Sequence, residues 1–144
     1  MIYTDEEVPL LYLLPILQRI VRLTDAHKEY GLTRSQVIVL MALCTRESVT
    51  MSEVAQYMSS SKEQATRAIA PLCDQGLVER FEIPENRTLV YIRFSEKGKN
   101  FMKMFEARLR TEITAKLHAS LSDAEINALR TSICTAVELL SKVK

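Results

Sequence analysis

The fold of this chain is decided by residues 60–98, which read SSKEQATRAIAPLCDQGLVERFEIPENRTLVYIRFSEKG. A helix start at the first serines leads into a helical run that ends at Gly76, because glycine readily closes a helix. Two short strand candidates follow, Leu77–Phe81 and Leu89–Phe94, with a polar turn over Glu82–Arg87 between them. A serine then caps a further helix. This order of helix, hairpin and helix predicts a small β-hairpin wing beside a helix.

A second helix lies just upstream and completes a helix-turn-helix. The sequence Thr50-Met51-Ser52-Glu53 has the form of a capping box, in which the threonine accepts from the N3 amide and the glutamate bonds back to the cap. It opens a short helix that is predicted to end near Met58. The next helix is capped by Ser60 or by Ser61, so its start stays open by one residue. Two capped helices this close together are what a helix-turn-helix requires.

The apolar residues of these helices indicate how they pack. Thr33 caps a helix that is predicted from Arg34 to about Thr45. The inner face of that helix is predicted to comprise Val37, Leu40, Met41 and Cys44. In the helix that follows the two serines, the packed face is predicted to comprise Ala65, Ala68, Ile69 and Leu72.

Amphipathic helices flank the predicted winged unit. A long one runs from Glu96 to about Ala119, and another follows a capping box at Ser122 and continues to the end of the chain. The segment Asp5–Tyr30 is predicted to be helical in its second half, and its apolar stretch over residues 10–17 needs a cover. The cover is either the rest of the subunit or a second copy. Because a small unit offers these helices little to bury against, they are interpreted as a dimerisation module.

Length and composition fit this organisation. The chain has 144 residues, of which 47% are hydrophobic, with only 3 glycines and 4 prolines, and such a chain can bury a core and has no disordered linker. We therefore expect a mainly α fold with a small β-hairpin wing (α+β) in a single compact subunit over residues 1–144. Residues 32–98 are expected to form the winged helix-turn-helix unit, and residues 1–31 and 99–144 the dimerisation helices.

Several classes of function are disfavoured by what the sequence lacks. His27 and His118 are isolated, no glycine-rich phosphate loop is present, and the cysteines show neither CxxC nor metal-ligand spacing. We therefore expect no enzyme activity, no metal and no cofactor. The start of the chain lacks a basic secretion signal, and its apolar run is too short to span a bilayer, so a reduced, cytoplasmic setting away from membranes is expected. The net charge of +1 neither favours nor opposes a nucleic-acid partner.

Five short motifs occur in order along the chain. They are Leu32-Thr33-Arg34-Ser35-Gln36, Glu53-Val54-Ala55, Thr66-Arg67, Gly76-Leu77-Val78-Glu79-Arg80 and Phe94-Ser95-Glu96-Lys97-Gly98. By these motifs and their spacing the chain resembles the MarR-type winged helix-turn-helix transcriptional regulators over nearly its full length. The resemblance implies a homodimer built by the terminal helices. It also implies that the dimer binds a pseudo-palindromic operator in double-stranded DNA, as a repressor, and leaves it on meeting a small aromatic or amphipathic effector or an oxidant.

The helix that starts at the two serines is the candidate recognition helix, because the second helix of a helix-turn-helix enters the major groove. Lys62 and a serine hydroxyl at its start suit phosphate. Gln64 suits adenine and Arg67 suits guanine. The predicted contacts to DNA are Ser61, Lys62, Gln64, Thr66, Arg67 and, on the wing, Arg87.

Three of the charged residues have alternative roles. Arg67 could instead form an ion pair with Asp74 or Glu63 on a solvated face. Glu63 could reach a cytosine amino group or simply cap the helix. In the family that the chain resembles, the wing turn usually reads Asp-x-Arg, with that arginine in the minor groove. Here the arginine comes one residue earlier, as Arg87, which is either the wing contact or a solvated turn charge.

Two other functions remain open. A winged unit that binds protein and not DNA fits the near-zero net charge. A cysteine-based redox-sensing regulator would use Cys44 or Cys73. The simpler interpretation of Cys44, Cys73 and Cys134 is that they are small, buried apolar residues, because free cysteines are so often buried.

Overall fold

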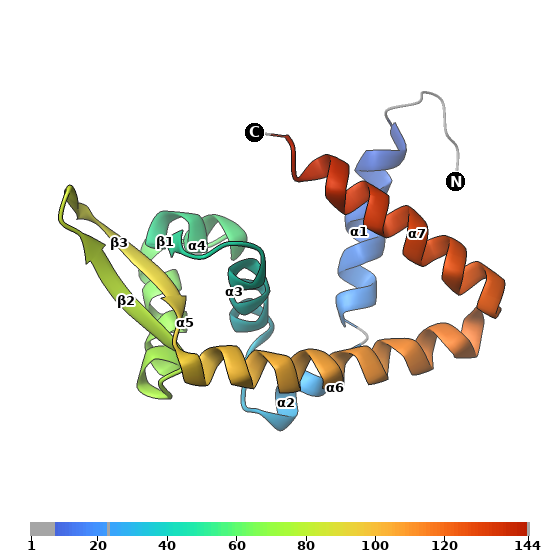
Figure 1. Ribbon diagram of the computed structural model, residues 1–144, viewed down its shortest axis with the longest axis horizontal. Coiled ribbons are helices and arrows are strands. Elements are labelled where there is room, and N and C mark those ends of the chain that lie inside the picture. Colours follow the sequence, from blue (N-terminus) through green and yellow to red (C-terminus); the bar gives the residue numbers. More distant parts are fainter. Residues whose placement is uncertain (1–7, 23, 144) are drawn as a thin grey trace. The chain divides into compact units, whose positions relative to one another are not determined.

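The computed structural model describes residues 8–22 and 24–143, and for residues 8–11 and 21 it describes the backbone alone. The predicted dimerisation segment 1–31 therefore lies partly outside the described residues. The fold is mainly α with one small antiparallel sheet, as the sequence predicts (Figure 1). A first compact unit ends at Ala107 and a second begins at Arg108. The elements in chain order are α1 (Val8–Arg22), α2 (Ala26–Glu29), α3 (Arg34–Thr45), β1 (Val49–Thr50), α4 (Met51–Tyr57), α5 (Lys62–Asp74), β2 (Val78–Ile83), β3 (Asn86–Phe94), α6 (Glu96–Ser120) and α7 (Asp123–Leu140).

Complete capping boxes begin α3, α5 and α7. In each box a side-chain oxygen at the cap accepts from the N3 amide, while the N3 side chain accepts from the cap amide. The start of α5, which the sequence leaves open between two serines, is therefore fixed by Ser61. The three pairs are Thr33 with Gln36, Ser61 with Gln64, and Ser122 with Glu125.

The box predicted at Thr50 is only partly formed. Thr50 Oγ1 accepts from the Glu53 amide at 3.2 Å, so the cap itself is present. The Glu53 carboxylate, however, forms an ion pair with Arg46, which follows the end of α3. The carboxylate also accepts from the Thr50 hydroxyl at 3.3 Å, so it stays beside the cap residue but binds its hydroxyl and Arg46 instead of its amide.

The hairpin is longer than predicted. Pairing of β2 with β3 continues as far as Ile83 opposite Asn86, so the turn shrinks from the predicted residues 82–87 to Pro84 and Glu85. The added residues lie at the outer end of the wing, where all of them except the half-buried Ile83 are exposed. The added residues of β3, Asn86–Thr88, are all polar and exposed and therefore lack the alternation by which a half-buried strand is recognised, whereas Ile83 of β2 continues it beyond Phe81.

A third strand, β1, was not predicted. It comprises only two residues and pairs with β3 through Val49 opposite Ile92, which gives the antiparallel order β1-β3-β2. So short a segment has no periodicity of its own. It is recognisable only by its pairing with a strand more than 40 residues away in the sequence.

The buried face of α3 differs from the prediction. Met41 is 43% exposed and Cys44 is exposed, so the predicted inner face is wrong at both positions. Leu40 is fully buried as expected. The buried face of α3 includes the polar residue Gln36. A pattern of apolar residues cannot predict that a polar residue is buried. The buried residues of α3 are Gln36, Val39, Leu40 and Leu43.

The second unit comprises the C-terminal part of α6 and the whole of α7. A groove of about 470 Å³ in this unit is lined by residues of both helices, among them Leu117, Ile126 and Ile133. Along α7, large apolar side chains are exposed at Leu129, Ile133, Val137 and Leu140. In the first unit, α1 exposes Leu14, Ile16 and Leu17. Among the helices described, none combines the length and apolar character needed to cross a membrane.

Candidate nucleic-acid interface

One face of α5 is buried in the first unit and the other faces solvent. Ala65, Ile69 and Leu72 are fully buried, and Ala68 is half-buried, so the predicted packed face is confirmed. Because a helix turns by about 100° per residue, the residues between these anchors point outward. The exposed residues in the first part of α5 are Lys62, Glu63, Gln64, Thr66 and Arg67.

Three of the predicted DNA-contacting side chains already form hydrogen bonds within the helix. Ser61 Oγ accepts from the Gln64 amide at 3.2 Å, and Gln64 Oε1 accepts from the Ser61 amide at 3.1 Å. Thr66 Oγ1 donates to the Lys62 carbonyl oxygen at 2.9 Å. These bonds fix the first turn of α5, and they leave the Ser61 hydroxyl proton and the Gln64 side-chain NH₂ free to donate outward.

The charged side chains of α5 form no ion pairs. Within residues 8–22 and 24–143, neither Lys62, Glu63 nor Arg67 takes part in a salt bridge. The alternative pairing of Arg67 with Asp74 or Glu63 is therefore not formed. Lys62, Glu63, Thr66 and Arg67 line one shallow, open depression on the solvent side of the helix.

The wing carries Arg87 as an exposed residue next to the hairpin turn. Asn86 Oδ1 accepts from the Thr88 amide at 3.2 Å and also from the Thr88 hydroxyl. These bonds hold the Asn86 side chain at the start of β3 and leave Arg87 as the basic side chain at this end of the wing. In Figure 1 the tip of the hairpin extends beyond the helices of the first unit, so Arg87 is presented apart from the residues of α5.

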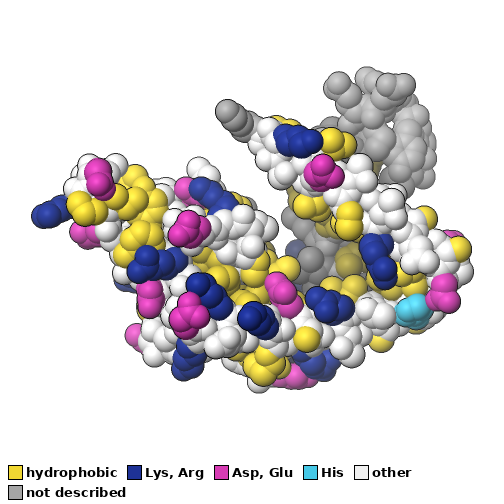
Figure 2. All heavy atoms as spheres, viewed as in Figure 1, with side chains coloured by type: hydrophobic (Ala, Val, Ile, Leu, Met, Phe, Trp, Pro, Cys, Tyr) yellow, Lys and Arg dark blue, Asp and Glu magenta, His cyan; other side chains and the backbone are white. Residues whose placement is uncertain are grey.

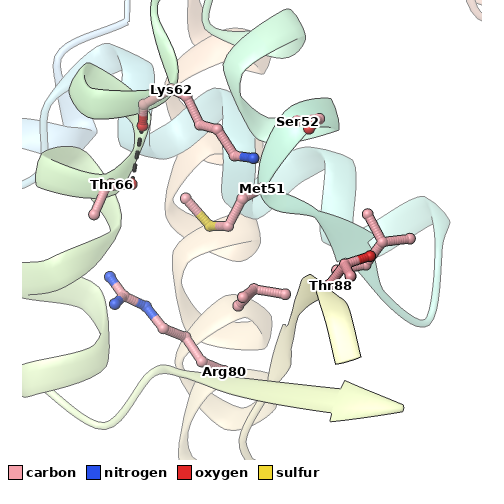
Figure 3. A pocket seen from close by; sticks show the side chains of 8 residues that line it. Met51, Ser52, Lys62, Thr66, Arg80 and Thr88 are labelled. Atoms are coloured by element: carbon pink, nitrogen blue, oxygen red, sulfur yellow. Dashed lines mark hydrogen bonds between the residues drawn. The ribbon is translucent and has the colours of Figure 1, made fainter. Parts of the chain in front are cut away.

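A cavity of about 180 Å³ lies between the start of α5 and the hairpin (Figure 3). Two basic side chains, Lys62 from α5 and Arg80 from β2, enter it beside apolar residues. Sequence reasoning missed Arg80, although Val78, two residues earlier on the same strand face, is buried. Because alternate residues of a strand share a face, the apolar Val78 could have indicated that Arg80 also lies on the side of α5. The lining residues are Met51, Ser52, Lys62, Thr66, Arg80, Thr88, Leu89 and Val90.

The base of the wing is tied to the end of α5 and the start of α6. Ser95 Oγ donates to the Gly76 carbonyl oxygen and accepts from the Gly98 amide at 2.9 Å. Lys97 Nζ donates to the Gln75 carbonyl oxygen at 2.7 Å, which satisfies an acceptor at the end of α5. These bonds connect the end of α5 with the base of the wing and the start of α6.

Charges of both signs are interspersed over the first unit. On the face shown in Figure 2, Lys and Arg side chains alternate with Asp and Glu side chains, including at the hairpin tip on the left. This agrees with the net charge of +1. Contacts to a polyanion would therefore depend on where individual cations lie and not on a large positive field.

The cysteines are not buried in the way that the sequence suggested. Cys44 and Cys134 are exposed and Cys73 is half-exposed, because each lies outside the packed face of its helix. The Cys44 thiol donates to the Leu40 carbonyl oxygen at 3.3 Å. Partial burial of the sulfur and the nearby Glu106 carboxylate raise the pKa of Cys44 from 9.0 to about 11. In the described part of the chain, no group of His, Cys, Asp and Glu side chains is arranged to hold a metal ion.

Comparison with known proteins gives concordant results. Residues 30–87 match the model of the MarR family. The HTH-type transcriptional regulator TcaR of Staphylococcus aureus (strain Newman) is 27% identical over 110 residues, which cover 75% of this chain and 72% of that protein. The structure of wild-type MarR from E. coli in its apo form has a TM-score of 0.73 at 18% identity, covering 94% of this chain and 98% of that one. A mutant E. coli MarR complexed with operator DNA has a TM-score of 0.62 at 20% identity, covering 94% and 99%.

Proposed function

Because residues 30–87 match the model of the MarR family, we propose that the chain is a transcriptional repressor that binds a pseudo-palindromic operator as a homodimer. The match to this family of transcriptional regulators and the similarity to a curated transcriptional regulator support a regulator and not an enzyme. The relative from S. aureus is a transcriptional regulator by name, and the mutant E. coli MarR of similar fold is bound to operator DNA. DNA is the partner that this proposal assigns to the exposed face of α5.

The observation that carries the proposal is the pair of exposed, unpaired cations on α5. Lys62 and Arg67 point away from the core, and neither is neutralised by a carboxylate in the described chain. In a helix-turn-helix, this face of the second helix meets the base edges and phosphates of the major groove. Lys62 and Ser61 suit phosphate, Arg67 suits guanine, and Arg87 reaches the backbone or minor groove from the wing.

The homodimer is proposed from the apolar side chains that the subunit leaves uncovered. Leu129, Ile133 and Val137 recur at helical spacing on α7 and are 37–61% exposed. An exposed apolar surface of this size indicates an interaction surface. A second copy of the chain, related by two-fold symmetry, would bury it. The segments 1–31 and 99–144 are the proposed dimerisation helices, and the winged unit 32–98 is presented once per half-site. A regulator of this kind acts where the DNA is, in the cytoplasm.

Release by a small molecule is proposed at the cavity beside α5. Lys62 and Arg80 offer positive charge there, while Met51 and Val90 offer apolar wall. This combination suits a small amphipathic anion, such as an aromatic carboxylate. An occupant would neutralise Lys62 and crowd the start of α5, and both effects would lower affinity for phosphate. Isothermal titration with benzoate, on the wild type and on Arg80→Gln, measures this binding without DNA.

DNA binding is tested by fluorescence anisotropy with the DNA upstream of the protein's own gene, at two salt concentrations. Affinity should fall as salt rises, because phosphate contacts release counterions. Arg67→Ala should cost about 1–3 kcal/mol of specific binding. Arg130→Ala, an exposed arginine of α7, is the matched control and should leave affinity unchanged if α7 does not touch DNA. Unchanged affinity in Arg67→Ala would remove its assigned role.

The dimer is tested by sedimentation velocity. Ile133→Glu places a charge on the exposed apolar face of α7 and should shift the protein toward monomer, with a parallel loss of operator affinity. Thr131→Glu, on the same helix and also exposed, is the control for added charge. A wild-type protein that sediments as a monomer at working concentration would refute the dimer.

A protein-binding winged module without DNA affinity remains the second candidate, since the net charge of +1 gives no electrostatic preference for nucleic acid. It predicts no binding to any DNA, even at low salt. The redox-sensing alternative is less well supported at Cys44, because a raised pKa keeps its thiol protonated and weakly nucleophilic.

A further inference from the structure

Glu63 is an acidic residue in the middle of the basic face of α5. It is exposed, and it lines the same open depression as Lys62, Thr66 and Arg67. The sequence left it open whether Glu63 caps the helix. The structure gives the capping box to Ser61 and Gln64, so the Glu63 side chain is not needed there.

The Glu63 carboxylate also has no cation partner. Arg67 lies one turn further on, at the i+4 spacing that brings side chains together on a helix, yet the two form no ion pair in the described chain. An unpaired carboxylate on a DNA-facing surface is repelled by the phosphates and lowers affinity for DNA in general. Any favourable contribution of Glu63 to DNA binding must therefore come from a specific base.

The donor and acceptor pattern of the major groove restricts which base that is. A carboxylate only accepts hydrogen bonds. Guanine presents two acceptors and thymine an acceptor with a methyl group, so neither suits it. Adenine presents a donor beside the N7 acceptor, which repels a carboxylate, whereas cytosine presents its N4 amino group as a donor.

We propose that Glu63 is a specificity-determining residue that accepts from the N4 amino group of a cytosine in each operator half-site, beside the base contacted by Arg67. The proposal rests on the proposed function, since it assigns the sequence read by α5. Residues at the start of a recognition helix are the ones that reach base edges, and Glu63 is the second residue of α5. Lys62 beside it takes the adjacent phosphate.

The test begins with selection of a DNA library by the wild-type dimer, followed by anisotropy titrations against single-base variants of the selected half-site. One position should require cytosine, with a loss of roughly 5- to 150-fold for other bases. Glu63→Gln should shift that position toward adenine, which glutamine contacts at N6 and N7. Glu63→Ala should lose the preference there and bind unrelated DNA more tightly, because a negative charge is removed.

Asp74→Asn is the matched control, since Asp74 is an exposed acid at the other end of the same helix. It should keep the wild-type base preferences, and unchanged melting temperatures should show that each variant is folded. Base preferences that survive in both Glu63 variants would overturn the proposal, as would a uniform loss of affinity for every sequence, which would make Glu63 a positioning residue for Arg67. Absence of any DNA binding by the wild type would instead refute the proposed function itself.

Discussion

The side-chain amide of Gln36 in α3 donates from Nε2 to the carbonyl oxygen of Ala68 in α5, at 2.9 Å. The same side chain accepts at Oε1 from the Thr33 amide, also at 2.9 Å, as part of the capping box of α3. Gln36 is only 6% exposed. One buried amide therefore connects the first turn of α3 with the middle of α5, one residue beyond Arg67. It fixes how α5 is rotated and hence which side chains point outward.

Gln36→Leu keeps the size of this side chain and removes both hydrogen bonds. We expect the free energy of unfolding to fall by about 1–3 kcal/mol, because the Thr33 amide loses its acceptor at a half-buried site. Urea unfolding followed by circular dichroism measures this loss. Gln56→Leu makes the same change at an exposed position of α4 and should stay within about 0.5 kcal/mol of the wild type. Equal stabilities for the two variants would contradict the role given to Gln36.

Gly98 is required by a close approach of two backbones. A Cβ atom at this position would lie 1.8 Å from the Leu77 carbonyl oxygen, so Gly98→Ala must push the start of α6 away from β2. We expect a loss of about 3 kcal/mol or more, the upper range for overpacking. Gly31→Ala is the control, because Gly31 has φ +67° but no atom within 4 Å of an added Cβ, and backbone strain alone costs about 1 kcal/mol. Thermal unfolding should separate the two variants, and a smaller loss for Gly98→Ala would be contrary to this geometry.

Ser61 combines a structural role with a proposed DNA contact, and two substitutions separate them. Ser61→Ala removes the cap and should cost about 1 kcal/mol of stability. Ser61→Asp keeps a capping oxygen and adds a charge that the helix N-terminus favours, so stability should be retained. The same charge repels phosphate, and operator affinity should fall more in Ser61→Asp than in Ser61→Ala. The opposite order of affinities in the anisotropy assay would place Ser61 away from the DNA backbone.

The raised pKa of Cys44, about 11, predicts slow reaction with thiol reagents. At pH 8 only about one thiol in a thousand would be ionised, and the rate should climb about tenfold per pH unit up to pH 10. Glu106→Gln removes a carboxylate that raises this pKa and should accelerate the reaction. The measurement uses a variant with Cys73→Ser and Cys134→Ser, so that Cys44 alone reacts with a disulfide dye. Rapid, pH-independent labelling would argue instead for a sensing thiol.

The same pKa shift also affects stability. An unfolded thiol ionises near 9.0, before the folded one does, so the contribution of Cys44 to folding is complete below pH 9 and is lost as pH rises toward 11. Cys44→Ser, which does not ionise in this range, should show a shallower decline of unfolding free energy between these pH values.

The sequence by itself determined where most helices begin and end, because that information is local. Capping residues, the glycine that stops α5 and the apolar periodicity lie within a few residues of one another. They sufficed to predict both ends of α5 and α6 within one or two residues and the start of α7 at Ser122, whereas α7 ends at Leu140, before the predicted end. The buried side of α5 follows from the same periodicity. The candidate reading face, with Lys62 and Arg67, is simply the other side.

Only the tertiary structure decided the features that depend on partners far away in the sequence. The buried face of α3 includes Gln36 because its partner is Ala68, and the Glu53 carboxylate binds the Thr50 hydroxyl and Arg46 in place of the predicted cap amide. The strand β1 exists through pairing with β3, and Arg80 lines the same cavity as Lys62 because the hairpin lies beside the start of α5. Local patterns determine the backbone conformation over one or two helical turns. The partner to which a polar side chain bonds is determined only when the helices and strands pack together.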